Sequence, residues 1–165
     1  MSVGWIDNIV TGSGGRKALF YAIAAVIYLL DQGTKYLIVQ TLPLHDSREV
    51  LPFFNIVYVR NIGSAFGLFK GLGNGTFIAL SVVALAILAV LIRISNSDLY
   101  AFSLLLGGAA GNATDRVARA YVVDFLDVYV GRYHWPAFNV ADSALTVGIV
   151  ILMINQFRAK TSIVK

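Results

Sequence analysis

Two aspartates, Asp124 and Asp142, are the residues of this sequence best suited to chemistry. They flank a short polar and aromatic segment in a chain that is 58% hydrophobic and 13% charged. A carboxylate near bilayer depth costs at least about 2.5–3.5 kcal/mol, so it usually faces a bundle interior or a cavity and has a function. Two carboxyl groups on one cavity cannot both ionise easily, and a shared proton lets such a pair activate water. The pair therefore predicts aspartyl peptidase chemistry within a membrane.

The surroundings of the two aspartates differ. Asn139 is a suitable helix N-cap, which puts Asp142 at the third helical position, where an acid meets the helix dipole favourably. Capping alone would explain Asp142. Asp124 has apolar neighbours on both sides in an extended or loop segment, where a lone carboxylate would be costly. Pairing the two explains both: the helix start favours an ionised Asp142, apolar neighbours favour a protonated Asp124, and the shared proton belongs to the coupled pair.

Two other functions use the same residues. Asp124 and Asp127 could form half of a Mg²⁺ site for lipid-phosphate chemistry, although residues three apart on a strand point to opposite faces. His45 and His134 lie in expected surface segments without a metal-binding pattern. A small proton-coupled transporter or scaffold is the second alternative, in which the aspartates relay protons or hold helices together.

Further polar residues lie within apolar segments. Asp31 and Lys35 are four residues apart, so on a helix they share a face and can form an ion pair. Asn112, Asp115 and Arg116 place an amide, a carboxylate and a guanidinium at one helix end. We expect Arg116 to partner Asp115 or its neighbours, either as a structural clamp or while positioning substrate carbonyls. Earlier in the same segment, Gly107, Gly108 and Gly111 favour close helix approach.

The elements that must position these residues are four apolar segments, each near the length of about 20 residues that a spanning helix needs. They run over residues 17–39, 74–93, 99–119 and 140–158. Segments 40–73 and 120–139 favour strands and turns at the membrane surface. The short link over residues 94–98 requires an antiparallel helix pair, so both surface segments lie on one membrane face. We expect a single integral membrane domain over residues 1–165.

Composition excludes several classes of function. The net charge of +4 comes from scattered Lys and Arg residues that form no basic face, so nucleic acid is not an expected partner. The chain has no cysteine, which excludes disulfides, thiolate metal sites and a cysteine nucleophile. The distribution of basic residues narrowly favours cytoplasmic termini, with the stretch from Met1 to Gly15 cytosolic or interfacial.

Five blocks of sequence resemble the bacterial lipoprotein signal peptidases, or type II signal peptidases. The blocks are Asp31 to Lys35, Asn61 to Phe66, Gly111 to Arg116, Val122 to Phe125 and Phe138 to Ser143. They follow one another in the family's order across most of the chain. This chain departs from the family pattern at Ser64, where alanine is usual, and at Ala113 and Thr114, where a bulkier apolar pair is usual.

The resemblance implies a fold and an activity. Members of the family are mainly α membrane proteins of the bacterial inner membrane, with four transmembrane helices, cytoplasmic termini, a small extracytoplasmic β-rich cradle and a periplasmic helix. They remove the signal peptide from diacylglyceryl-modified prolipoproteins, cutting before the lipidated cysteine. They need no metal or organic cofactor, act on lipid-modified substrates within membrane lipid, and are inhibited by globomycin.

The resemblance also implies roles for individual residues. Asp124 and Asp142 match the family's catalytic pair. Positions that line or support the site are matched by Asn61, Asn112, Arg116 and Asn139, and further supporting positions by Asp31, Lys35 and Asp115.

Overall fold

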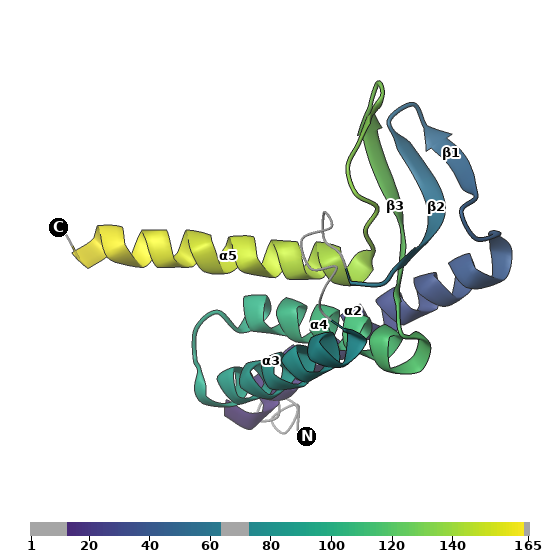
Figure 1. The fold of residues 1–165 in the computed structure, drawn as a ribbon. Helices are drawn as coiled ribbons and strands as arrows, with labels where there is room; N and C mark the ends of the chain where they lie inside the picture. The colour runs from purple at the N-terminus through teal and green to yellow at the C-terminus, as the bar shows by residue number, and fades with distance from the viewer. Residues whose placement is uncertain (1–12, 64–72, 164–165) are drawn as a thin grey trace, which may run out of the picture.

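The computed structural model describes residues 13–63 and 73–163 as a mainly helical protein with one small antiparallel sheet (Figure 1). The helices are α2 (Ser13–Thr41), α3 (Asn74–Ile94), α4 (Leu99–Arg119) and α5 (Val140–Ile163). The strands are β1 (Ser47–Leu51), β2 (Phe54–Asn61), β3 (Val122–Val130) and β4 (Tyr133–His134). The stretch before Ser13, which was expected to be cytosolic or interfacial, and residues 64–72, which include Ser64, lie outside the described residues.

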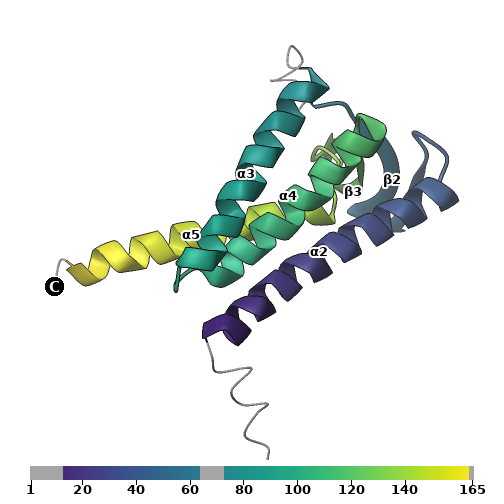
Figure 2. The same cartoon turned by 90° about the horizontal axis from the view of Figure 1, so that it is seen from below.

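Three of these helices have the length and composition to cross a membrane, over Gly15–Thr41, Asn74–Ile94 and Val140–Arg158. The fourth, α4, is as long as α3 but more polar, with Asp115, Arg116 and Arg119 in its last two turns. It packs against α2, α3 and α5, and Figure 2 shows it between α2 and α3. The helix that packs against the other three therefore carries a polar C-terminal end. The predicted class, a mainly helical membrane protein with a small sheet, is confirmed.

Glycines let α4 take this central place. A Cβ atom added to Gly107 would lie 2.5 Å from the Ala24 carbonyl oxygen of α2. A Cβ on Gly108 would lie 2.6 Å from the Ala141 carbonyl oxygen of α5. Real Cβ atoms do not approach backbone oxygens this closely. The prediction of small residues at close helix contacts is confirmed on two sides of α4.

The sheet has the strand order β1-β2-β3-β4, with antiparallel neighbours. In sequence, the helices α3 and α4 lie between β2 and β3. The two strands pair with each other, with Val59 of β2 opposite Asp124 of β3. In Figure 1 the sheet projects from the ends of the helices. Its base is held by a buried cluster of Leu42, Tyr58 and Val123, where the end of α2 meets β2 and β3. The strands expected in both surface segments are present.

A buried ion cluster joins the helices to the sheet. The Lys35 ammonium lies 2.8 Å from Asp31 and 3.1 Å from Asp115, and all three side chains are fully buried. Asp115 also pairs with Arg119 and accepts a 3.0 Å hydrogen bond from the Val123 N–H at the start of β3. Asp31 accepts a 2.9 Å hydrogen bond from the N–H of Ala141, in the first turn of α5. The cluster therefore connects α2, α4, β3 and α5.

Arg116 was expected to partner Asp115 or its neighbours, and the pairing with Asp115 is wrong. Its partners are Lys35 and Arg119, and Arg116 forms no ion pair with it among the described residues. The physical reason is helical geometry, because residues four apart share a face whereas adjacent residues do not. The ion pair expected between Asp31 and Lys35 is confirmed.

Replacing Gly108 with alanine tests the close contact between α4 and α5. The added methyl group must push Ala141 and the first turn of α5 away from α4, at a cost of about 1–3 kcal/mol in the free energy of unfolding. Thermal unfolding in detergent measures the loss. Gly33→Ala in α2 is the matched control, because its Cβ would meet nothing within 4 Å and alanine favours helix by up to about 1 kcal/mol. Equal unfolding temperatures for the two variants would contradict the contact.

Replacing Lys35 with methionine tests the ion cluster. The variant keeps much of the side-chain volume but removes the ammonium that pairs with Asp31. Of the two ion pairs of Asp115, it leaves the one with Arg119. We expect a loss of about 3–5 kcal/mol, because an uncompensated buried charge remains. The same thermal assay measures it, with Arg132→Met as a control that removes one exposed charge. If Lys35→Met and Arg132→Met unfolded at the same temperature, the cluster would not stabilise the fold.

Candidate active site

The pairing of β2 with β3 places an amide against the Asp124 carboxyl group. Val59 lies opposite Asp124, and Asn61 is two residues farther along β2, on the same face of the sheet. The Asn61 Nδ2 donates to Asp124 Oδ2 at 2.9 Å. Asp124 itself is only 2% exposed. The strand pairing therefore holds a buried carboxyl group at a defined position.

The N-terminus of α5 positions the second aspartate. The Asp142 backbone N–H donates to Asn139 Oδ1 at 2.8 Å, which is the hydrogen bond of an N-cap side chain to the third helical residue. The predicted capping role of Asn139 is confirmed. The carboxyl group of Asp142 is half-buried, and its Oδ1 accepts from Asn112 Nδ2 at 2.8 Å. Asp142 thus lies in the first turn of α5, and its carboxyl group bonds to Asn112 on α4.

One asparagine connects the two aspartates. Asn139 is fully buried, and its Nδ2 donates to Asp124 Oδ1 at 2.7 Å while its Oδ1 accepts from the backbone of Asp142. Because the cap requires the amide oxygen on one side, the amide nitrogen must face Asp124 on the other. This single side chain therefore links the Asp124 carboxyl group to the backbone of Asp142.

The ion cluster orients a second amide. The Lys35 Nζ donates to Asn112 Oδ1 at 3.0 Å, and an ammonium can only donate. The Asn112 oxygen is therefore fixed toward Lys35 and its nitrogen toward Asp142. Lys35 thus reaches the aspartate pair indirectly, through Asn112.

The environment of Asp124 changes its acidity. Burial raises the pKa of Asp124 from 3.8 to about 7, and the negative charge of Asp142 adds to the rise. Hydrogen bonds from Asn61 and Asn139 and the charge of Lys35 act in the opposite direction. A carboxyl group with a pKa near 7 holds a proton part of the time at neutral pH, which suits a general acid or base.

Arg116 lies beside the pair, one helical turn after Asn112. Its guanidinium stacks on the ring of Phe77 from α3, 4.4 Å from the ring centroid. It lies within electrostatic range of both Asp124 and Asp142. Its Nη1 is buried and has no hydrogen-bond partner among residues 13–63 and 73–163. The group therefore carries a positive charge and a donor next to the two carboxyl groups.

The structure does not bring Asp127 to this cluster. Asp127 accepts from Asn55 Nδ2 at 2.9 Å and interacts with His134 Nδ1 at 2.9 Å, farther along the sheet. No group of three or more metal-binding side chains occurs in the described ranges. Asp124 and Asp127 therefore have separate sets of partners. His45 and His134 are both exposed, as expected.

Two residues of α3 that contact Arg116, beside the aspartate pair, were not predicted from the sequence. Phe77 stacks on Arg116, and Asn74 Nδ2 donates to the Arg116 carbonyl oxygen at 3.0 Å. An apolar residue in an apolar helix carries no signal for such a contact. Asn74 at the helix start could have been noticed as a polar residue at the end of an expected span.

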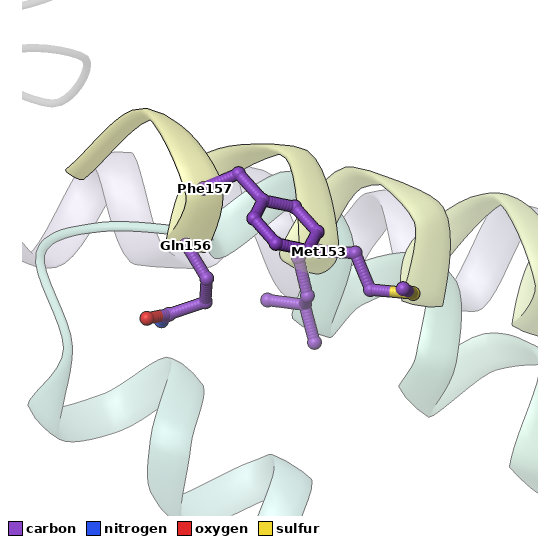
Figure 3. Close-up of a pocket in the computed structure, with 4 residues that line it drawn as sticks. Met153, Gln156 and Phe157 are labelled. Carbon is purple, nitrogen blue, oxygen red and sulfur yellow. The ribbon is translucent and has the colours of Figure 1, made fainter. Parts of the chain in front are cut away.

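A shallow apolar groove on α5 lies away from the aspartates. Figure 3 shows Met153, Gln156 and Phe157 lining it, and Leu152 completes the lining. This groove begins ten residues beyond Asp142, or about 15 Å along the helix. Its position on the outer side of a spanning helix suits lipid contact and gives no support for catalysis.

A family model described as signal peptidase (SPase) II matches residues 23–158 of the chain. Two curated proteins named lipoprotein signal peptidase illustrate the similarity. The protein of Syntrophotalea carbinolica is 48% identical over 82% of this chain and 89% of its own length. That of Cupriavidus taiwanensis is 47% identical over 92% of this chain and 89% of its own length.

The fold agrees with the sequence comparison. A solved structure described as a bacterial membrane enzyme superposes with a TM-score of 0.81 at 36% identity, covering 88% of this chain and 91% of that one. Of the five blocks that carry the resemblance, all but residues 64–66 fall in the described part of the chain. The chain belongs to the signal peptidase II family of membrane aspartic peptidases.

Proposed function

We propose that this protein is an intramembrane aspartic endopeptidase that removes the signal peptide from diacylglyceryl-modified prolipoproteins, cutting before the lipidated cysteine. The observation that carries the proposal is the buried Asn139 side chain, which holds Asp124 and Asp142 together. Membership of the signal peptidase II family supports the substrate class. The function also explains why a membrane protein keeps two carboxyl groups so close together.

The chemistry follows from the different environments of the two aspartates. The pair shares one proton, which resides mainly on Asp124 because burial and the charge of Asp142 raise its pKa to about 7. The Asp142 carboxylate takes a proton from a water molecule as the water oxygen attacks the scissile carbonyl carbon. Asp124 donates its proton to the carbonyl oxygen. Asp142 then returns its proton to the leaving amine as the C–N bond breaks, and Asp124 takes back a proton from a hydroxyl of the tetrahedral diol. The pair regains its single proton without a covalent enzyme intermediate.

The surrounding residues hold this arrangement in place. Asn61 and Asn139 fix Asp124, and Asn112 fixes Asp142. Arg116 supplies a positive charge beside the pair and a donor for a substrate carbonyl. The supporting residues are Asp31, Lys35 and Asp115, which keep the helices and β3 in register without meeting the substrate.

The proposal includes an orientation in the bacterial inner membrane. The chain is one integral domain, α4 spans the membrane together with α2, α3 and α5, and both termini are cytoplasmic. Segments 40–73 and 120–139, with the sheet and the aspartates, then face the outside, where they hold the lipidated end of the substrate. The exposed aromatic side chains of Tyr133 and Trp135 suit the membrane interface on that side. Globomycin would compete for the same site.

Replacing each aspartate with asparagine tests the catalytic pair. Asp124→Asn and Asp142→Asn should each lower the rate of cleavage of a lipidated precursor by about 10²–10⁴-fold, because an amide cannot exchange the proton. A gel-shift assay in detergent measures cleavage. Asp127→Asn is the matched control and should keep most of the activity, since the partners of Asp127 in the described part of the chain are Asn55 and His134.

The same assay distinguishes the alternatives. Similar losses in all three variants, together with inhibition of the parent enzyme by a chelator and rescue by Mg²⁺, would favour a metal-dependent lipid-phosphate enzyme. Full cleavage by Asp124→Asn would rule out the proposed mechanism.

The pH dependence of cleavage tests the raised pKa of Asp124. The proton on Asp124 is required, so kcat/KM should fall about tenfold per pH unit as pH rises beyond the Asp124 pKa of about 7. The Asn61 amide favours the ionised carboxylate, so Asn61→Ala should move this alkaline limb to higher pH. Asn55→Ala removes the equivalent amide from Asp127 and should leave the limb in place. An identical profile for the parent and Asn61→Ala would remove Asp124 from this role.

A further inference from the structure

Arg60 on β2 is exposed and held against two aromatic rings. Its guanidinium carbon lies 4.7 Å from the ring centroid of Tyr121 and 5.6 Å from that of Tyr58. Its Nε donates to the Tyr58 hydroxyl at 3.2 Å. Stacking and one hydrogen bond fix the direction of the fork while the terminal nitrogens stay available to a ligand. A pre-ordered guanidinium loses little conformational freedom when it binds an anion.

Arg60 lies on the face of the sheet opposite the aspartate pair. It pairs across the strands with Val123, whereas Asp124 pairs with Val59. Successive residues of a strand point to opposite faces, so Arg60 and Val123 share the face that packs on the end of α2. Asn61 and Asp124 share the other face. Arg60 is therefore not a member of the catalytic site.

A second basic residue acts on the two tyrosines that hold Arg60. Arg119, the last residue of α4, acts on the same two tyrosines. Burial on its own would raise the pKa of Tyr58, yet hydrogen bonds with Tyr121 and Arg60 and the charges of Arg60 and Arg119 lower it overall. Among the described residues, no carboxylate forms an ion pair with Arg60. Asp115 is already shared by Lys35 and Arg119.

The position of these residues along the helices indicates the kind of anion. Arg119 ends α4 and Tyr121 follows it by two residues, while Leu42, packed on Tyr58, directly follows α2. The ends of membrane-spanning helices lie at the level of the lipid headgroups, where Tyr side chains are enriched. The phosphate group of a phospholipid lies at that level, and a guanidinium binds phosphate by two parallel hydrogen bonds.

We propose that Arg60, Tyr58, Tyr121 and Arg119 form a binding site for the phosphate of an anionic phospholipid headgroup. Arg60 supplies the paired donors, the two rings hold it in place, and Arg119 adds charge. The bound lipid would rest against the base of the sheet, next to the end of α2. It would thereby anchor β2, the strand that also carries Asn61.

The test is lipid binding to the purified full-length protein in detergent, measured by native mass spectrometry during titration with phosphatidylglycerol. Arg60→Gln should weaken binding about tenfold or more, because it removes a charge-assisted hydrogen-bond pair. The affinity of Arg60→Lys should lie between those of the parent and Arg60→Gln, because lysine keeps the charge but loses the paired donors and the stacking on the rings. Arg132→Gln, which removes a charge from an exposed turn of the same sheet, is the matched control and should bind like the parent.

Tyr121→Leu is a second, independent variant. It leaves every charge in place and removes the ring beneath the guanidinium, so binding should weaken while the parent pattern of lipid preference remains. Thermal unfolding without added lipid checks that each variant is folded. Equal binding by Arg60→Gln and Arg132→Gln would overturn the proposal.

Two comparison ligands identify the group that is bound. Diacylglycerol lacks the phosphate and should not compete with phosphatidylglycerol, whereas glycerol phosphate lacks the acyl chains and should compete only weakly. Competition by diacylglycerol as strong as by phosphatidylglycerol would exclude a phosphate site. Full competition by glycerol phosphate would assign the site to a soluble phosphate and overturn the lipid proposal.

Discussion

The buried ammonium of Lys35 is the interaction on which the rest of this structure depends. It lies between the carboxylates of Asp31 and Asp115, and each carboxylate also accepts a backbone N–H, from Ala141 and Val123 respectively. Those two N–H groups are next to Asp142 and Asp124 in the chain. Lys35, which bonds to Asp31, Asp115 and Asn112, thus helps to fix the starts of β3 and α5, the two elements that carry the aspartates. Removing one partner from such a cluster is costly because the remaining charges stay buried.

The aspartate pair then works through a second constraint, the fixed orientation of amides. Asn139 has only one orientation that satisfies both the helix cap and Asp124, and Asn112 has only one that satisfies both Lys35 and Asp142. The two carboxyl groups therefore receive different partners. Asp124 lies in a buried strand and keeps its proton near neutral pH, whereas Asp142 lies at a helix start, where the dipole favours the anion. Asymmetry of this kind lets chemically identical side chains act as acid and base.

Features that depend on neighbouring residues of one helix could be predicted from local patterns in the sequence. The pair of Asp31 and Lys35, the cap at Asn139 and the small residues of α4 all follow from helical spacing and are present. Contacts between distant elements were not predictable in this way. Arg119 rather than Arg116 meets Asp115, and Phe77 supports Arg116, because the packing of α4 against α2 and α3 decides which face each residue occupies. The stacking of Arg60 on Tyr121 depends likewise on how the strands meet α4. The catalytic roles were inferred from resemblance to the family, since spacing alone also allowed a metal site or a proton relay.

The order of the elements along the chain has a consequence for biogenesis. Asn61 and Asp124 are 63 residues apart, and Asp142 lies in the first turn of the last helix. During synthesis, α2, both strands of the first hairpin, α3 and α4 emerge before the residue that completes the pair. A nascent chain is therefore inert toward its neighbours in the translocation machinery until α5 has entered the bilayer. The proposed proteolytic competence therefore appears only once α5 has been made, because the part of the chain made before it lacks one of the two aspartates.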